Sequence, residues 1–245
     1  METLKILKYT ELESTNTFAA TLNQNNITEQ ITVIWAVNQT KGRGQRANRW
    51  ESEENKNLTF SIILQPENFS VEKHFLISKT AALAIFDALS GFGIKTSIKW
   101  PNDIYFQDKK LGGILIENSL NGPYIVKSII GAGININQTE FSENLPNPVS
   151  LKDICQKEFD IEKVLHKITK AFNNRFQQLA NNQEEFISNE YFQNLYRNKG
   201  LHLYKNEDGE FLARIIEVKD SGELILEKEN GERSAYFFKE VEFVI

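Results

Sequence analysis

A glycine-rich segment, TKGRGQRANRW at residues 40–50, carries four cationic side chains that could bind or stabilise an anion. Arg43 has a glycine on each side, and Trp50 closes the segment. Glycines at 42 and 44 let backbone amides approach an anion, and arginines offset the charge of that anion. The segment therefore predicts either a solvated basic loop or a mobile loop that closes over phosphates, and its composition does not separate the two.

Part of this segment, GRGQRA, formally fits the dinucleotide-binding pattern G-x-G-x-x-A. That pattern requires a helix that opens directly after the glycines. Here the polar run NRWESEENKN follows, and it has no helical spacing of apolar residues. No G-x-x-x-x-G-K-[ST] motif occurs in the chain. The sequence thus argues against both a Rossmann site and a P-loop.

A second group lies in KWPNDIYFQDKKLGGILIEN, residues 99–118. A hairpin with QDKK at its tip would explain Lys109 as an exposed turn residue. It explains less well the WPND break between strands, or Lys110 directly before LGGILIE. Glycines at a strand entrance indicate close approach of the backbone to a ligand. A lysine beside them could stabilise negative charge that develops on a transferred phosphoryl or acyl group.

Two further segments have both a structural and a functional interpretation. The run ESTN (13–16) supplies an ordinary N-cap for a helix TFAATL, and its hydroxyls and amide could equally bind a neutral urea or amide group. The run GAGININ (131–137) fits a tight glycine turn, and its small residues could also leave room for a ligand that Asn135 would contact. The residues alone leave both choices open.

The elements that must position these groups follow from hydrophobic patterning. The β-branched runs at 31–40 and 58–64 predict buried strands, 74–89 predicts a buried helix, and 161–179 has the apolar spacing of a helix. Further strands are predicted at 113–118 and 124–136, and a further helix at 183–198. Because strands and helices do not alternate strictly, we expect an α+β main domain.

The pattern changes after residue 198. Short alternating runs such as LHLY, FLARIIEV and ELILEK are separated by the turns NEDG, DSG and ENG. We therefore expect two domains, a main domain at 1–198 and a small all-β domain at 199–245.

Bulk properties narrow the class of protein. The 245 residues carry a net charge of -5, whereas a general nucleic-acid binder would more often be basic. A single cysteine and three scattered histidines argue against a disulfide framework and against a protein metal site. The N-terminus lacks a secretory apolar run, and no segment approaches the roughly 20 apolar residues of a membrane span. We expect a cytoplasmic protein without a membrane partner.

The order ESTN, NQTKGRGQ…NRW, KWPNDIYFQDKKLGGILIE, GAGININ and PNPVSL closely resembles the biotin protein ligase family, the biotin–[acetyl-CoA-carboxylase] ligases. The resemblance runs from about residue 9 through the β domain. It implies a mixed-sheet catalytic domain like those of biotin and lipoate ligases, followed by a small SH3-like β-barrel. It also implies a reaction in which biotin and ATP form biotinyl-5′-AMP and pyrophosphate, after which a lysine of a biotin carboxyl carrier domain takes the biotinyl group.

The resemblance extends to individual residues. Lys110 would contact the acyl oxygen and the α-phosphate, and Asp103 would orient or deprotonate the incoming lysine amine. By resemblance, the biotin-binding residues are Ser14, Thr15, Asn16, Gln39, Arg43, Lys110 and Gly113, the nucleotide-binding residues are Gly42, Gly44, Gln45, Arg46, Trp50, Asn102 and Asn135, and the catalytic residues are Lys110, Arg43 and Asp103.

Two residues of the glycine-rich segment depart from the family's commoner pattern, Gly-Arg-Gly-Arg-x-Gly. Gln45 stands at the second arginine and supplies no charge, which Arg46 could replace, and Ala47 stands at the last glycine. Some relatives also carry an N-terminal DNA-binding module of about 60 residues. Here the catalytic pattern begins within the first dozen residues, so we expect no DNA binding.

The resemblance implies that Mg²⁺ binds mainly through the phosphates of ATP, and it leaves a homodimer open. A lipoate–protein ligase on the same scaffold is the nearest alternative, and a non-catalytic biotin or nucleotide sensor is a second one.

Overall fold

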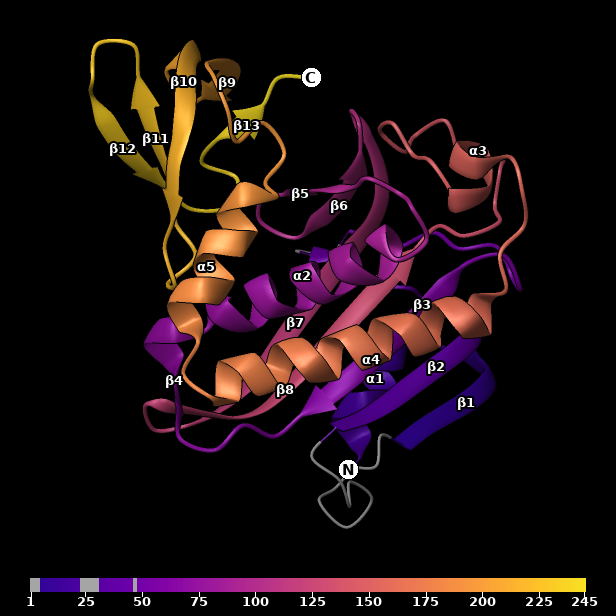
Figure 1. Cartoon of the computed structure of the whole chain (residues 1–245). Helices are drawn as coiled ribbons and strands as arrows, with labels where there is room; N and C mark the ends of the chain where they lie inside the picture. The colour runs from indigo at the N-terminus through magenta and orange to yellow at the C-terminus, as the bar shows by residue number, and fades with distance from the viewer. Residues whose placement is uncertain (1–4, 23–30, 46–47) are drawn as a thin grey trace.

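The structure is a computed structural model, and it describes residues 5–22, 31–45 and 48–245 (Figure 1). A large mixed sheet carries two long helices on one face, and a second, smaller sheet is formed by the C-terminal residues. The main-sheet strands are β1 (Lys5–Leu12), β2 (Ile31–Gln39), β3 (Leu58–Leu64), β4 (Phe69–Ser70), β5 (Ser97–Lys99), β6 (Asp103–Phe106), β7 (Lys109–Asn121) and β8 (Tyr124–Ile134). The helices are α1 (Thr15–Thr21), the 3-10 turn η3 (Val71–Lys73), α2 (Phe75–Ser90), α3 (Leu151–Cys155), α4 (Ile161–Ala180) and α5 (Glu184–Gln193).

The strand order of the main sheet is β1-β2-β3-β8-β7-β6-β5, with β4 pairing at one end of β8. The β1–β2 pair is parallel, and the other pairs are antiparallel. This order places β8 in the middle of the sheet, with β3 on one side and β7 on the other. The predicted α+β class with a mixed sheet is confirmed.

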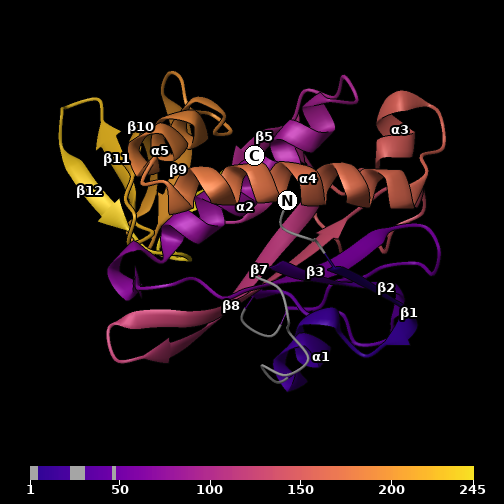
Figure 2. The same cartoon turned by 60° about the horizontal axis from the view of Figure 1, so that its bottom comes forward.

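The two faces of the sheet bury different things because side chains alternate along each strand. On β2, Val33 and Trp35 join the core beneath α2 and α4, while Ile34 faces the short helix α1 with Ile63 and Ile129. Figure 2 shows α1 on one side of the sheet and α2 with α4 on the other. The face covered by α2 and α4 is thus a continuous apolar core. The opposite face, on which α1 lies, has room for polar groups.

The C-terminal strands form a separate antiparallel sheet in the order β12-β11-β10-β9-β13. Its strands are β9 (His202–Asn206), β10 (Gly209–Val218), β11 (Leu224–Lys228), β12 (Arg233–Tyr236) and β13 (Glu242–Phe243). The sheet fits a small SH3-like domain, although among the described residues no pairing closes it into a barrel. The domain boundary at 198/199 stays a prediction.

A turn of this second sheet docks against the main domain. The Lys79 ammonium of α2 is buried and lies 2.7 Å from an Asp220 carboxylate oxygen, and it also donates to the carbonyl of Val218 at 2.8 Å. The Trp100 indole donates to the carbonyl of Gly222 at 3.0 Å. Burial lowers the pKa of Lys79, and the contact with Asp220 opposes that shift. The C-terminal sheet therefore braces the loop that follows Trp100.

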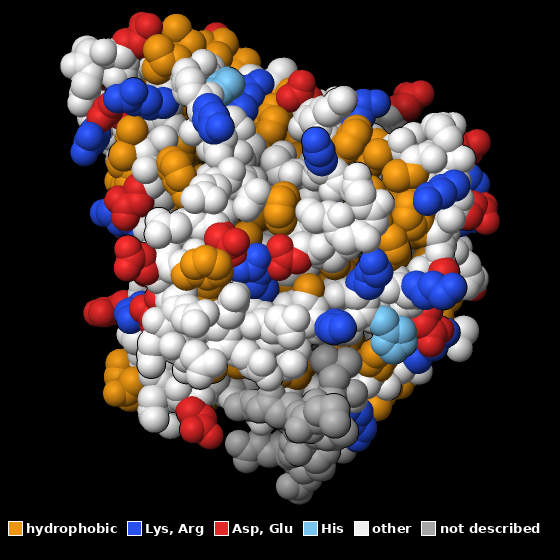
Figure 3. Space-filling view, viewed as in Figure 1, with side chains coloured by type: hydrophobic (Ala, Val, Ile, Leu, Met, Phe, Trp, Pro, Cys, Tyr) orange, Lys and Arg blue, Asp and Glu red, His pale blue; other side chains and the backbone are white. Residues whose placement is uncertain are grey.

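The predicted element positions hold except at several ends. The helix predicted to reach residue 198 ends at Gln193, because the chain then pairs with β5: Ile98 N–H donates to the Asn194 carbonyl and Tyr196 N–H to the Ile98 carbonyl. The strand predicted from residue 113 begins earlier, at Lys109. None of the described helices is long and apolar enough to cross a membrane. On the face shown in Figure 3, basic and acidic side chains are interspersed.

Candidate active site

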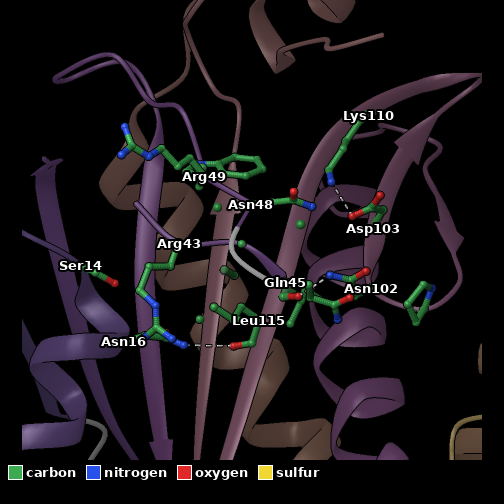
Figure 4. Close-up of a pocket in the computed structure, with 18 of the residues that line it drawn as sticks. Ser14, Asn16, Arg43, Gln45, Asn48, Arg49, Asn102, Asp103, Lys110 and Leu115 are labelled. Carbon is green, nitrogen blue, oxygen red and sulfur yellow. Dashed lines mark hydrogen bonds and ion pairs between the residues drawn. The ribbon is translucent and has the colours of Figure 1, made fainter. Parts of the chain in front are cut away.

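The predicted motifs converge on one cavity of about 220 Å³ on the α1 face of the sheet (Figure 4). The N-terminus of α1, the end of β2, the glycine-rich loop and the WPND turn all contribute to its wall. Of the predicted residues, those that line it are Ser14, Thr15, Asn16, Gln39, Arg43, Gly44, Gln45, Trp50, Asn102, Asp103, Lys110 and Gly113.

One end of the cavity is a recess of buried hydrogen-bonding groups. Gln39 Oε1 accepts from the backbone N–H of Thr15 at 2.7 Å and lies 3.1 Å from its hydroxyl. Ser61 Oγ lies 2.7 Å from Thr15 Oγ1 and 2.6 Å from Asn16 Oδ1. Ser14 caps α1 by accepting from Thr17 N–H at 3.5 Å. The structural and functional interpretations of ESTN are therefore compatible: the cap fixes the helix start, and the start brings its polar groups to the recess.

The side-chain amide of Asn16 is fixed by hydrogen bonds through both its nitrogen and its oxygen, and it packs against Gly131. Its amide donates to the carbonyl of Leu115 at 3.3 Å and to the carboxylate of Glu117 at 2.8 Å, while its oxygen accepts from Ser61. A β-carbon at Gly131 would lie only 2.1 Å from Asn16 Oδ1. Residue 131 must therefore lack a side chain for the amide to lie against the sheet.

The glycine-rich loop is folded back on itself as a short hairpin. Trp50 N–H donates to the Gly42 carbonyl at 3.1 Å, and Gly44 N–H donates to the Asn48 carbonyl at 2.7 Å. Gly42 lies outside the main cavity. Arg46, predicted to bind the nucleotide, and Ala47 fall outside the described residues. The described part of this loop, residues 40–45 and 48–50, is called the lid below; it lines one side of the cavity, and its closure over a ligand stays a prediction.

Arg43 of this loop is engaged by a carboxylate. Its guanidinium forms a two-pronged pair with Glu117, with N–O distances of 2.7 and 3.3 Å. The two side chains are 46% and 37% exposed, so solvent screens their attraction, and such pairs contribute little to stability. Because Glu117 also accepts from Asn16, one carboxylate connects the lid to the polar recess.

Lys110 and Asp103 form the second ion pair of the site, at 2.7 Å (Figure 4). They are brought together by the β6–β7 pairing, in which Asp103 lies opposite Gly113. A β-carbon at Gly113 would lie within 3.5 Å of both side chains. Asp103 is only 17% exposed, so removal of Lys110 would leave a largely buried carboxylate without its cation.

Trp50 lies flat against the sheet at Gly133, where a β-carbon would lie 2.2 Å from the indole ring. The indole N–H of Trp50 and the side-chain oxygen of Gln45 are shielded from solvent and have no hydrogen-bond partner among the described residues. Both atoms belong to the lid and face a cavity that could receive a ligand. Asn102 instead donates to the carbonyl of Ile114 at 2.6 Å, which fixes the WPND turn on β7.

Asn135, like Gly42, is a predicted residue that does not line the cavity. It is buried at the end of β8 and donates to the carbonyl of Val149 at 3.1 Å. In this state it holds the segment before α3 in place. Its predicted contact with a nucleotide stays a prediction.

Some residues of the site were given no role by the sequence analysis, among them Ser61, Glu117, Lys99 and Arg49. The alternation of LTFSIIL places Ser61 opposite the apolar face, which is a signal that the sequence carries. Glu117 is two residues beyond Leu115 and therefore shares its face of β7. Lys99 begins the KWPND motif, and the β5–β6 pairing brings it to the cavity beside Asp103.

The cavity has a polar recess with Arg43 beside it and Lys110 on another part of its wall, an arrangement that suits a small ligand with both neutral polar and anionic groups. Among the described residues no group of three His, Cys, Asp or Glu side chains is arranged to hold a metal ion. The chain belongs to the Biotin/lipoate A/B protein ligase family, whose sequence model matches residues 9–135.

Individual relatives agree with this assignment. The chain is 31% identical over 234 residues to the "Bifunctional ligase/repressor BirA" of Bacillus subtilis, a match that covers 92% of this chain and 70% of the relative. It is 31% identical over 146 residues to a "Biotin--[acetyl-CoA-carboxylase] ligase" of Paracoccus denitrificans, covering 57% of this chain and 60% of the relative. The structure of the biotin protein ligase from Aquifex aeolicus in complex with biotin and ATP superimposes with a TM-score of 0.81 at 27% identity, covering 98% of this chain and 99% of that one.

Proposed function

We propose that this chain is a biotin protein ligase that activates biotin with MgATP as biotinyl-5′-AMP and transfers the biotinyl group to a lysine of a biotin carboxyl carrier domain. The observation that carries the proposal is the convergence of the ESTN, GRG, WPND and KLGG motifs on one cavity. The family membership and the similarity to a ligase that binds biotin and ATP support it.

In the first step, a carboxylate oxygen of biotin attacks the α-phosphorus of ATP. The bond from that phosphorus to the β-phosphate oxygen breaks, and its electron pair leaves with pyrophosphate. Arg43 and Lys110 both line the cavity, and each can offset part of this charge. A preorganised cation in a site closed to water is worth several kcal/mol of barrier, roughly 3–4 for one lost donor. Closure of the loop around Arg43 would also keep water from the mixed anhydride.

In the second step, the amine of the carrier lysine attacks the acyl carbon of biotinyl-5′-AMP, and AMP leaves with the electron pair of the broken acyl–oxygen bond. The amine must lose a proton, and Asp103 is the carboxylate that lines the cavity. The Lys110 ammonium lies 2.7 Å from this carboxylate. When Lys110 turns to the phosphate, Asp103 is free to accept a hydrogen bond and then the proton from the amine.

The polar recess suits the ring system of biotin. Thr15, Asn16 and Gln39 present a hydroxyl and two amides that are already fixed by mutual hydrogen bonds, so little ordering is needed when a ureido group binds. The magnesium ion enters as part of MgATP. Asp103 is the described carboxylate at the cavity and is already paired, which fits an ion held mainly by phosphate oxygens.

Four predictions reach beyond these observations. The carrier would be a subunit or domain of a carboxylase, and the protein would be cytoplasmic, would not bind DNA, and could form a homodimer. The single cysteine and the net charge of -5 support the location and the absence of DNA binding, and gel filtration with light scattering measures the oligomeric state.

The deciding experiment incubates the protein with biotin, MgATP and a purified carrier domain. We expect pyrophosphate release and a carrier whose mass rises by one biotinyl group. The Lys110→Met variant is the catalytic control, and a carrier whose acceptor lysine is replaced by arginine is the acceptor control. Lipoate in place of biotin tests the related activity: modification by lipoate and not by biotin would refute the proposal. Biotin binding without pyrophosphate release would indicate a sensor.

A further inference from the structure

Among the described residues, Lys99 and Arg49 are the two cations that line the cavity and that the reaction described above does not use, and Lys99 is the more enclosed of them. It is the last residue of β5, and its side chain lines the cavity together with Asp103 and Lys110. Its ammonium lies 5.1 Å from the ring centroid of Tyr105 and 5.1 Å from that of Phe243. Within residues 5–22, 31–45 and 48–245, no ion pair includes Lys99, whereas Arg43 and Lys110 each have a carboxylate partner.

This setting is costly for a positive charge. Burial lowers the pKa of Lys99; the carboxylate of Asp103 opposes the shift, and the charges of Lys110 and Arg197 add to it. The faces of Tyr105 and Phe243 offset part of this cost. Asp103, the nearest candidate to neutralise Lys99, is taken by Lys110 at 2.7 Å. An anion that enters the cavity would supply the missing counter-charge.

Strand register gives the direction in which such an anion would extend. Lys99 lies opposite Asp103 in the β5–β6 pair, and Lys110 lies opposite Tyr105 in the β6–β7 pair. The three charged side chains therefore form a row across neighbouring strands, with Lys110 toward the glycine-rich loop and Lys99 toward the C-terminal sheet, where it meets Phe243. An ATP molecule with its α-phosphate at Lys110 could place its outer phosphates along this row.

We propose that Lys99 binds the β- and γ-phosphates of ATP and stabilises the pyrophosphate leaving group during adenylate formation. The inference rests on the proposed function. As the bond between the α-phosphorus and the bridging oxygen breaks, the electron pair stays on pyrophosphate, and Lys99 lowers the energy of that charge without giving up a proton. Lys99 has no part in the second step, because pyrophosphate has then left.

The test separates the two half-reactions. Biotin-dependent exchange between pyrophosphate and ATP reports the first, and transfer from supplied biotinyl-5′-AMP to the carrier domain reports the second. The variants are Lys99→Met, which removes the charge at similar length, and Lys99→Arg, which keeps it. Lys95→Met is the matched control, because Lys95 is an exposed lysine in the loop that precedes β5.

We expect K99M to raise the KM for pyrophosphate and for MgATP by at least about tenfold, the effect of losing one hydrogen bond to a charged group. K99R should recover part of this loss, and K95M should behave as the wild type. Transfer from supplied biotinyl-5′-AMP and the affinity for biotin should not change in K99M.

Several results would overturn the inference. An unchanged KM for pyrophosphate in a folded K99M would leave Lys99 only a structural role, and slower transfer from the supplied adenylate would place it at the incoming amine. If the wild type shows no exchange at all, the proposed function fails. Titration calorimetry with magnesium pyrophosphate then still compares the wild type with K99M, and equal affinities would refute the phosphate site itself.

Discussion

Replacing Ser61 by alanine tests whether the polar recess depends on a residue outside the recognised motifs. Ser61 lies in the middle of β3, fully buried, between Thr15 Oγ1 at 2.7 Å and Asn16 Oδ1 at 2.6 Å. A hydroxyl has one proton to donate. It can donate that proton to Asn16 and accept one from Thr15, so Ser61→Ala removes two contacts at once.

The loss of stability in Ser61→Ala depends on whether Thr15 and Asn16 can form other hydrogen bonds. Without Ser61, the Thr15 hydroxyl can still donate to Gln39 Oε1 at 3.1 Å. Asn16 Oδ1 loses the one donor that the described hydrogen bonds give it, in a residue that is 3% exposed. A buried polar atom left unsatisfied costs about 1–3 kcal/mol. For a protein of this size that corresponds to a fall in Tm of about 2–4 °C per kcal/mol.

The β8 strand offers a control of the same chemistry. Ser128 is also fully buried in the main sheet, but its hydroxyl has no hydrogen-bond partner among the described residues. Ser128→Ala should therefore leave Tm unchanged or raise it slightly. Both variants are measured by scanning calorimetry with and without biotin. Ser61→Ala should lower Tm and weaken biotin binding, and equal behaviour of the two variants would refute the hydrogen-bond network described here.

The remaining predictions concern the charges and glycines of the cavity. Asp103→Asn should slow transfer from biotinyl-5′-AMP to the carrier more than it slows adenylation, and equal slowing in single-turnover assays would contradict its role at the amine. Glu117→Gln should free Arg43 while its amide oxygen still accepts from Asn16. We expect calorimetry to show tighter biotin binding, by up to about fivefold for an exposed ion pair, and weaker binding would mean that Glu117 orients Arg43 for the ligand. Gly133→Ala places a carbon 2.2 Å from the indole of the lid. It should shorten the lifetime of bound biotinyl-5′-AMP in gel filtration, whereas a wild-type lifetime would show that the ring can shift at no cost.

Sequence motifs located most of the cavity because each motif sits at the end of a secondary-structure element. ESTN starts α1, Gln39 ends β2, and KLGG starts β7, so the fold needed only to bring three element ends together. Hydrophobic patterning located the long elements for a similar reason, since α2 and α4 bury nearly whole faces. Local sequence therefore predicts the structure well where it depends on the ends of helices and strands and on their apolar faces.

The contacts that the sequence did not predict depend on strand register and on other pairings between distant residues. Ser61 reaches Asn16 because it lies opposite Gly131, a glycine 70 positions along the chain in the adjacent strand. Lys99 enters the cavity because β5 pairs with β6, and that edge of the sheet also captures residues 194–196 and so shortens α5. Asn135 is a polar residue beside a glycine motif, and only the position of Val149 shows that its amide is already used. Each of these depends on a contact between residues distant in sequence.

The pairing of two cations of the site with carboxylates has a consequence for the order of events. Arg43 pairs with Glu117, and Lys110 pairs with Asp103. A substrate anion that binds either cation therefore exchanges with a carboxylate already in place. The exchange at Lys110 also releases Asp103. If Asp103 accepts the proton of the carrier lysine, as proposed above, it becomes available for that role only when Lys110 has turned to an acyl phosphate. On that proposal, the ion pair between Lys110 and Asp103 delays the second reaction until the first has produced its anhydride.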